Sequence, residues 1–291
     1  MSEELAQPGT IRIEAHGGVT IAADHWPGEL APVVLAHGGG QTRHSWGGTA
    51  AAIAARGHRV VSIDLRGHGD STWAPDGDYA MAAYREDALA VADHLGEPVV
   101  WVGASLGGMT GLHAVDASPE RFRGLVLVDI TPRPAARGVK RILEFMADKA
   151  IEGFATLDEA ADAIAAYQPH RPRPTDLSGL AKNLRQGEDG RWRWHWDPAF
   201  LDIRTGGSSE HARDRHHAEL EQMARRLALP VLLVRGKLSD LVTDAEVAAF
   251  REMVPHADYV DVAGAAHMIA GDRNDVFTDA VLSFLTPTRA N

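Results

Sequence analysis

Short apolar runs recur along the chain, and each closes on glycine or a polar residue. Four of them precede residue 131, at residues Pro32–Ala36, Arg59–Leu65, Pro98–Gly103 and Gly124–Ile130. They lack the polar–apolar alternation of a strand with one solvent-exposed face, so they are typical of strands buried on both faces of a parallel sheet. The segments between them have helical apolar spacing, and one of these, Ala80–Leu95, ends at a glycine. This alternation predicts right-handed βαβ units and an α/β chain with a mostly parallel sheet.

The alternation stops at Ile130 and resumes only at residues 229–236. Because strands of the sheet lie on both sides of the interruption, we predict an inserted segment rather than a second domain that follows the first. We assign residues 1–130 and 227–291 to the core and residues 131–226 to an inserted helical cap.

Composition excludes several classes of function. The 291 residues include no cysteine, which excludes disulfides, zinc–thiolate sites, iron–sulfur clusters and a cysteine nucleophile. The net charge of −11 weighs against non-specific binding to nucleic acid or anionic membranes. The N-terminus carries two acids and no apolar core, so it is not a signal peptide, and no apolar stretch is long enough to span a bilayer. We expect a soluble, cytoplasmic protein that binds neither nucleic acid nor membrane.

The strongest chemical signal is the pattern Gly-x-Ser-x-Gly at residues 103–107. It directly follows a predicted strand and directly precedes a predicted helix, and this is the context in which the pattern marks a nucleophile on a sharp turn. The turn needs small residues two places before and two places after Ser105, and the following helix places N–H groups beside its hydroxyl. We predict that Ser105 is a nucleophile.

A serine hydroxyl needs a base and a group that orients the base. Among fifteen histidines, His267 follows the last predicted strand, where its side chain reaches the end of the sheet. Asp240 follows the strand at residues 231–234, and the order Ser105, Asp240, His267 matches the serine–acid–histidine order of this arrangement. We therefore assign Asp240 as the acid, with Asp129, at the end of the preceding strand, as the alternative.

Acyl transfer also needs two N–H donors aimed at the developing oxyanion. Leu106, directly after the serine, supplies one. The glycines that follow the first buried strand leave the backbone open, and we choose Gly39 for the second donor, with Gly40 as the alternative.

The chain resembles the α/β-hydrolase superfamily, in particular its capped esterases, cofactor-free haloperoxidases and epoxide hydrolases. The resemblance covers about two-thirds of the chain. It rests on the following residues: His37-Gly38 with Trp46 nine residues later, Asp64-Leu65-Arg66-Gly67-His68-Gly69-Asp70-Ser71, the turn at Ser105, the turn at Asp240, and Gly264-Ala265-Ala266-His267.

The resemblance implies an eight-stranded, mostly parallel sheet flanked by helices, with the cap inserted. It also implies that the segment from Asp64 to Ser71 is a structural turn, so His68 and Ser71 are not catalytic. Epoxide hydrolases and haloalkane dehalogenases carry aspartate where this chain carries Ser105, which excludes their alkyl-enzyme mechanism and leaves an acyl-enzyme.

We therefore expect a cofactor-independent serine hydrolase that cleaves a carboxylic ester or lactone of a small, largely apolar substrate. Three alternatives stay open: a perhydrolase, a carbon–carbon bond hydrolase whose substrate carboxylate an arginine would hold, and a small-molecule receptor with little turnover.

The substrate pocket is the least constrained part of the site. Three tryptophans alternate in the insertion and would share one face of an extended segment. They either wall an apolar pocket or pack the cap onto the core. The candidate pocket residues are Gly40, Trp46, Trp192, Trp194, Trp196 and Met268.

Two polar clusters in the insertion receive a structural interpretation. Arg171 and Arg173 are expected in a solvated loop, with an anion site as the alternative. His211, His216 and His217 are expected on the surface of a helix, because their spacing lacks a metal-binding pattern. We predict no metal and no cofactor.

Overall fold

The computed structural model describes residues 7–201, 210–267 and 274–286. Within them, one eight-stranded sheet has the order β1-β2-β4-β3-β5-β6-β9-β10. β1 and β2 form an antiparallel hairpin and β2 also pairs antiparallel with β4, whereas every other pairing in this sheet is parallel. The expected eight-stranded, mostly parallel sheet is confirmed. The strands are β1 Gly9–Glu14, β2 Thr20–Trp26, β3 Leu30–Ala36, β4 His58–Ile63, β5 Val99–Ala104, β6 Phe122–Val128, β9 Val231–Gly236 and β10 Asp258–Val262.

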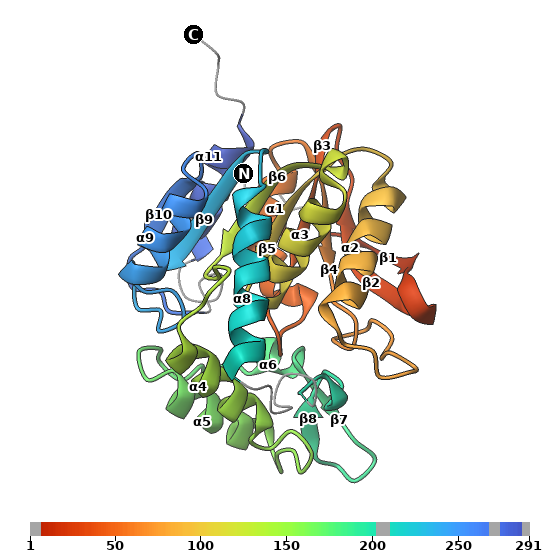
Figure 1. Cartoon of the computed structure of the whole chain (residues 1–291). Helices are drawn as coiled ribbons and strands as arrows, with labels where there is room; N and C mark the ends of the chain where they lie inside the picture. Colours follow the sequence, from red (N-terminus) through yellow and green to blue (C-terminus); the bar gives the residue numbers. More distant parts are fainter. Residues whose placement is uncertain (1–6, 202–209, 268–273, 287–291) are drawn as a thin grey trace.

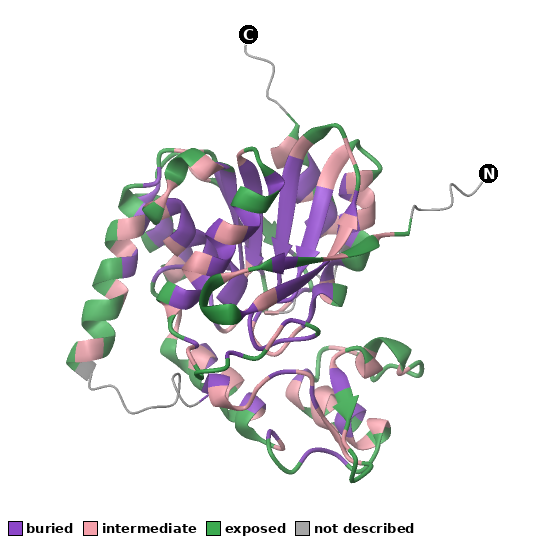
Figure 2. Cartoon of the chain, turned by 90° about the vertical axis from the view of Figure 1, so that its right-hand side faces the viewer, coloured by how far each residue is buried: buried purple, intermediate pink, exposed green. Residues whose placement is uncertain are grey.

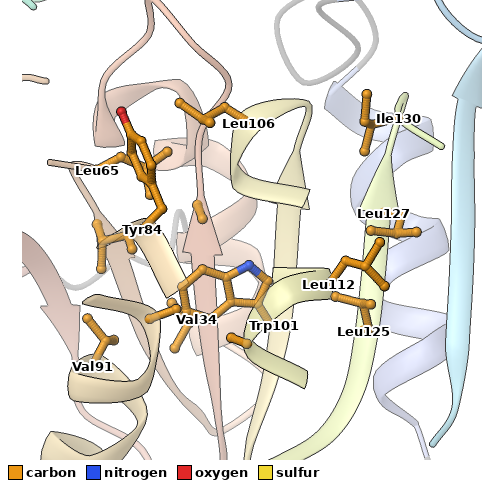
Figure 3. Packing of buried hydrophobic residues seen from close by; sticks show 14 of the residues in the cluster. Val34, Leu65, Tyr84, Val91, Trp101, Leu106, Leu112, Leu125, Leu127 and Ile130 are labelled. Carbon is orange, nitrogen blue, oxygen red and sulfur yellow. The ribbon is translucent and has the colours of Figure 1, made fainter. Parts of the chain in front are cut away.

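Helices cover both faces of this sheet (Figure 1). On one face, α2, α3, α8 and α9 pack over one of the two hydrophobic clusters, in which Trp101 of β5 and Leu112 of α3 fill the space between strand and helix (Figure 3). On the other face, α1 and α11 pack over the second cluster. These helices are α1 Gly47–Ala54, α2 Met81–Leu95, α3 Leu106–Ala117, α8 Glu210–Arg225, α9 Asp244–Met253 and α11 Asn274–Leu285.

The central strands are buried along almost their whole length (Figure 2). The side chains of Val33, Val34, Leu35 and Ala36 in β3 are fully inaccessible, on both faces alike. This burial explains why these runs are continuously apolar in the sequence.

The chain from α4 to β8 leaves the sheet and lies beyond the carboxyl ends of its parallel strands (Figure 1). Besides helices, it contains a small antiparallel sheet of two strands. Its described elements before residue 202 are α4 Ala136–Ala147, α5 Leu157–Tyr167, α6 Ser178–Ala181, β7 Leu184–Gln186 and β8 Trp192–Trp194.

The last helix of the predicted cap, α8, packs instead against α3 and α9 of the core. Its buried residues Leu220 and Ala224 belong to the same hydrophobic cluster as α3. The carboxyl-terminal part of the predicted cap of residues 131–226 therefore packs on the core, because α8 buries apolar side chains there. We call residues 131–201 the inserted segment.

Candidate active site

Ser105 lies at the sharp turn between β5 and α3. Its backbone has φ +45° and ψ −109°, a conformation that a residue with a side chain rarely adopts and that costs about 1–3 kcal/mol. A Cβ atom on Gly103 would lie 2.3 Å from the carbonyl carbon of Gly107, and one on Gly107 would lie 2.3 Å from the carbonyl oxygen of Ala36. The turn is therefore possible only with glycine at both positions, as the sequence pattern predicts.

Ser105 and His267 line the same cavity, whose volume is about 350 Å³. The cavity lies between the sheet and the inserted segment, since residues of α4, α5, α6 and β8 contribute to its wall. Most of its lining side chains are apolar, and among the described residues that line it there is no arginine or lysine.

His267 pairs with Asp129. The distance from its Nδ1 to Oδ2 of Asp129 is 2.8 Å, and the Asp129 side chain is fully buried. Asp129 follows β6 directly and has φ +49°, which is uncommon for a residue with a side chain.

The prediction that Asp240 pairs with His267 is wrong. The Asp240 carboxylate forms an ion pair with Arg141 of α4, with 2.9 Å between Oδ2 and the nearer guanidinium nitrogen. The alternative considered for the acid, Asp129, is the residue that contacts His267. β6 and β9 are neighbours in the sheet, so the ends of both strands lie near His267, and only the three-dimensional structure distinguishes them.

The Asp129 carboxylate has two further partners, both in the turn that follows β9. The backbone N–H of Gly236 donates to Oδ1 at 3.0 Å, and the hydroxyl group of Ser239 donates to Oδ2 at 2.6 Å. Sequence analysis missed Ser239. Its position three residues after Gly236, in the loop where the acid was expected, was the available signal.

The two predicted oxyanion donors have free N–H groups. Within the described part of the chain, the amides of Gly39 and Leu106 donate to no protein acceptor, and Leu106 is the first residue of α3, where helix geometry offers none. The N–H of the alternative donor, Gly40, is engaged, because it donates to Nε2 of His68 at 3.1 Å. Gly39 is therefore the better placed of the two glycines.

The segment from Asp64 to Ser71 is a hydrogen-bonded turn beneath this site. Its buried Arg66 pairs with Asp87 of α2, at 2.6 Å between Nε and Oδ2. Both ring nitrogens of His68 have backbone partners, and the hydroxyl of Ser71 donates to the Asp64 carbonyl. The polar atoms of His68 and Ser71 thus form hydrogen bonds that stabilise the backbone, in agreement with the prediction that this segment is a structural turn.

His37 is buried next to this turn. Desolvation by the surrounding protein lowers its pKa to about 4. Its Nε2 accepts the N–H of Leu65 at 3.0 Å, so Nδ1 carries the proton and donates to the Gly38 carbonyl. The neutral ring therefore fixes the start of the glycine segment that contains Gly39.

The predicted pocket residues divide into three groups. Gly40, Trp194 and Trp196 line the cavity. Trp46 and Trp192 do not, which contradicts the prediction for both residues, and Met268 lies outside the described residues.

The reason differs for the two excluded tryptophans. Trp46 is buried on the opposite face of the sheet, where its ring lies 5.5 Å from that of Phe277 in α11. Trp192 pairs through its backbone with Phe154, so it belongs to the packing of the inserted segment itself.

Most of the cavity wall was not predicted from the sequence. It comes from one face of α4 with Leu143 and Met146, from Met109 of α3, and from Phe200. The helical apolar spacing of α4 is the signal that could have identified its contribution.

The two polar clusters noted between residues 131 and 226 also have defined places. Arg173 forms ion pairs with Asp158 and Asp162, and it does not line the cavity. His216 and His217 do line the cavity, from α8. The described residues contain no group of three or more potential ligands placed to hold a metal ion, and no described helix is long and apolar enough to cross a membrane.

Comparison with known proteins agrees with this geometry. The model of the alpha/beta hydrolase fold family matches residues 31–273. The chain belongs to this family.

Individual relatives are hydrolases. The chain is 30% identical to the esterase Rv0045c of Mycobacterium tuberculosis over 91% of this chain and 86% of that protein. It is also 30% identical to a 3-hydroxybutyrate-oligomer hydrolase of Cupriavidus necator, over 85% of this chain and 86% of the other. These relatives support assignment of the chain as a hydrolase.

Solved structures show the same fold. The crystal structure of Rv0045c superimposes with a TM-score of 0.72 at 28% identity, covering 96% of this chain and 92% of that one. An E-2-(acetamidomethylene)succinate hydrolase superimposes with a TM-score of 0.79 at 22% identity, covering 96% and 99%. The second similarity concerns the fold alone.

Proposed function

We propose that this chain is a serine hydrolase that cleaves a carboxylic ester or lactone of a small, largely apolar substrate through an acyl-enzyme. The observation that carries the proposal is the His267–Asp129 pair, because its histidine lines the same cavity as the serine of the β5–α3 turn. The similarity to an esterase and to an ester-oligomer hydrolase supports ester cleavage.

In the first half of the reaction, Nε2 of His267 takes the proton of the Ser105 hydroxyl as its oxygen attacks the substrate carbonyl. Asp129 holds the Nδ1 proton, which keeps Nε2 free to act as the base, and it stabilises the imidazolium that forms. The N–H groups of Gly39 and Leu106 donate hydrogen bonds to the oxyanion.

His267 then protonates the departing alkoxide, which leaves the acyl group on Ser105. In the second half, the same imidazole removes a proton from water, and the hydroxide attacks the acyl carbonyl. Collapse of the second tetrahedral intermediate returns the proton to Ser105 and releases the acid.

The lining of the cavity supports an apolar substrate. Aliphatic and aromatic side chains from α4, β8 and α3 surround the space next to Ser105, and a cavity of about 350 Å³ is at the small end of ligand pockets. A carbon–carbon bond hydrolase would need a cation for its substrate carboxylate, and the absence of arginine and lysine from the described lining weighs against that alternative.

Hydrolysis of p-nitrophenyl esters from acetate to octanoate tests the proposal. We expect multiple turnovers by the wild-type protein, loss of turnover in Ser105→Ala, and full activity in Ser283→Ala, whose hydroxyl bonds within its own helix α11. Turnover that survives in Ser105→Ala would contradict the proposal. Ligand binding by the folded protein with a single burst, or without turnover, would support the receptor alternative.

A further inference from the structure

We propose that Ser239 is a positioning residue, which fixes the Asp129 carboxylate and through it the base His267. The proposal rests on the proposed function, in which Asp129 and His267 serve Ser105. It concerns a residue outside the serine–histidine–acid set, on the turn that follows the neighbouring strand β9.

The hydrogen bonds of the Ser239 hydroxyl determine where its proton points. A serine hydroxyl has one donor and two acceptor positions. Its oxygen accepts the backbone N–H groups of Leu241 at 3.1 Å and Val242 at 3.2 Å. Both acceptor positions are therefore occupied, and the single proton is directed at Oδ2 of Asp129, 2.6 Å away.

The same oxygen of Asp129 contacts His267. Oδ2 lies 2.8 Å from Nδ1 of His267, so this one atom joins the base and Ser239. Without Ser239, the protein would hold the carboxylate by the Gly236 N–H on Oδ1 and by His267 itself. Only one donor from the rigid turn would then remain, on Oδ1, so the carboxylate would be less restrained about its χ2 bond, and the imidazole would move with it.

A short turn brings both fixed donors to the carboxylate. The N–H of Ser239 donates to the carbonyl of Gly236 at 2.9 Å, which closes the turn between the two residues. The side chain of Leu238, inside the same turn, is 56% exposed. Leu238 is therefore a matched control for Ser239.

The experiment compares Ser239→Ala, Ser239→Thr and Leu238→Ala by p-nitrophenyl ester kinetics. We expect Ser239→Ala to lose roughly 10- to 100-fold in kcat, the loss for a hydrogen bond to a charged group. Ser239→Thr, which keeps the hydroxyl, should restore most of the rate, and Leu238→Ala should match the wild type.

A double-mutant cycle separates positioning from a purely structural role, because two residues that act through one another have non-additive effects. In an Asp129→Asn background, Ser239→Ala should change the residual rate by less than about twofold. If Ser239→Ala lowered the rate by the same factor in the Asp129→Asn background as in the wild type, the proposal would be overturned.

A spectroscopic measurement keeps this test independent of the proposed function. The proton between His267 and Asp129 should give a downfield proton NMR resonance that moves or broadens in Ser239→Ala and persists in Leu238→Ala. If the wild type cleaved no ester, the proposed function would fail while this resonance still decided the role of Ser239. The same resonance in wild type and Ser239→Ala would overturn the positioning role.

Discussion

Asp240 and Arg141 form an ion pair that joins the loop after β9 to the inserted helix α4, with 2.9 Å between carboxylate and guanidinium. The backbone reinforces this contact, since a Cβ atom on Gly138 of α4 would lie 2.4 Å from the Asp240 carbonyl oxygen. Asp240 therefore fastens the inserted segment to the core, and the buried Asp129 contacts His267 in its place.

The two carboxylates should respond differently to the same substitution. Asp129→Asn should reduce kcat by roughly 10³- to 10⁴-fold, because the amide no longer selects the imidazole tautomer that leaves Nε2 free as a base. Asp240→Asn should stay within about threefold of the wild type, since a partly exposed ion pair contributes at most about 1 kcal/mol. Ester kinetics of the two variants, with circular dichroism to confirm folding, makes the comparison. A severe loss in Asp240→Asn with a mild one in Asp129→Asn would reverse the assignment.

The contrast between these residues shows what the sequence could predict about the site. Ser105 was identifiable because its turn depends on neighbours two residues away, and His267 because it follows the last strand. The acid was not, because β6 and β9 are about 100 residues apart in the chain and adjacent in the sheet. An aspartate follows each of the two strands near the same histidine. Which aspartate contacts His267 depends on the positive φ at Asp129 and on the contact of Asp240 with Arg141.

The same limit applies to the pocket. The strand–helix alternation predicted the core, whose contacts are largely between successive units. Trp46 and Trp196 are both buried tryptophans. Trp46 packs within the core and Trp196 lines the pocket because they lie on different sides of the sheet, which the sequence does not show.

Gly107 should be among the least replaceable residues of the chain. A methyl group there would lie 2.3 Å from the carbonyl oxygen of Ala36, a backbone atom that strand β3 holds in place. We expect Gly107→Ala to lose more than about 3 kcal/mol of unfolding free energy or to fail to fold. Gly179→Ala in the helix α6, where no atom lies within 4 Å of the added Cβ, should leave stability within about 1 kcal/mol of the wild type. Denaturant unfolding measures both, and a native-like Gly107→Ala would show that the turn can shift.

Met146 should limit the acyl chain length. It lines the cavity, and its Cε atom would lie 3.1 Å from a Cβ atom on Gly40, so it lies over the glycine segment beside Ser105. Met146→Ala should move the optimum of the p-nitrophenyl ester series to longer acyl chains. It should also lower the unfolding free energy by about 2–5 kcal/mol. Met253→Ala removes a similarly buried methionine from α9, away from the cavity, and should cost stability without moving the optimum. The same chain-length profile in both variants would exclude Met146 as part of the acyl site.

His37 should make the folded state sensitive to acid. Burial lowers its pKa from 6.5 to about 4, so the unfolded chain binds a proton between these values that the folded chain does not. Its contribution to stability is therefore complete above pH 6.5 and is lost as the pH falls toward 4, by about 3 kcal/mol in total. His37→Asn removes the titrating group, so the unfolding free energy of this variant should fall less steeply between pH 6.5 and 4 than that of the wild type, even though the variant is less stable at neutral pH. Urea unfolding across this range measures the slope, with the exposed His94→Asn as the control that should keep the wild-type slope. Equal slopes in wild type and His37→Asn would mean that His37 is not held neutral in the folded protein.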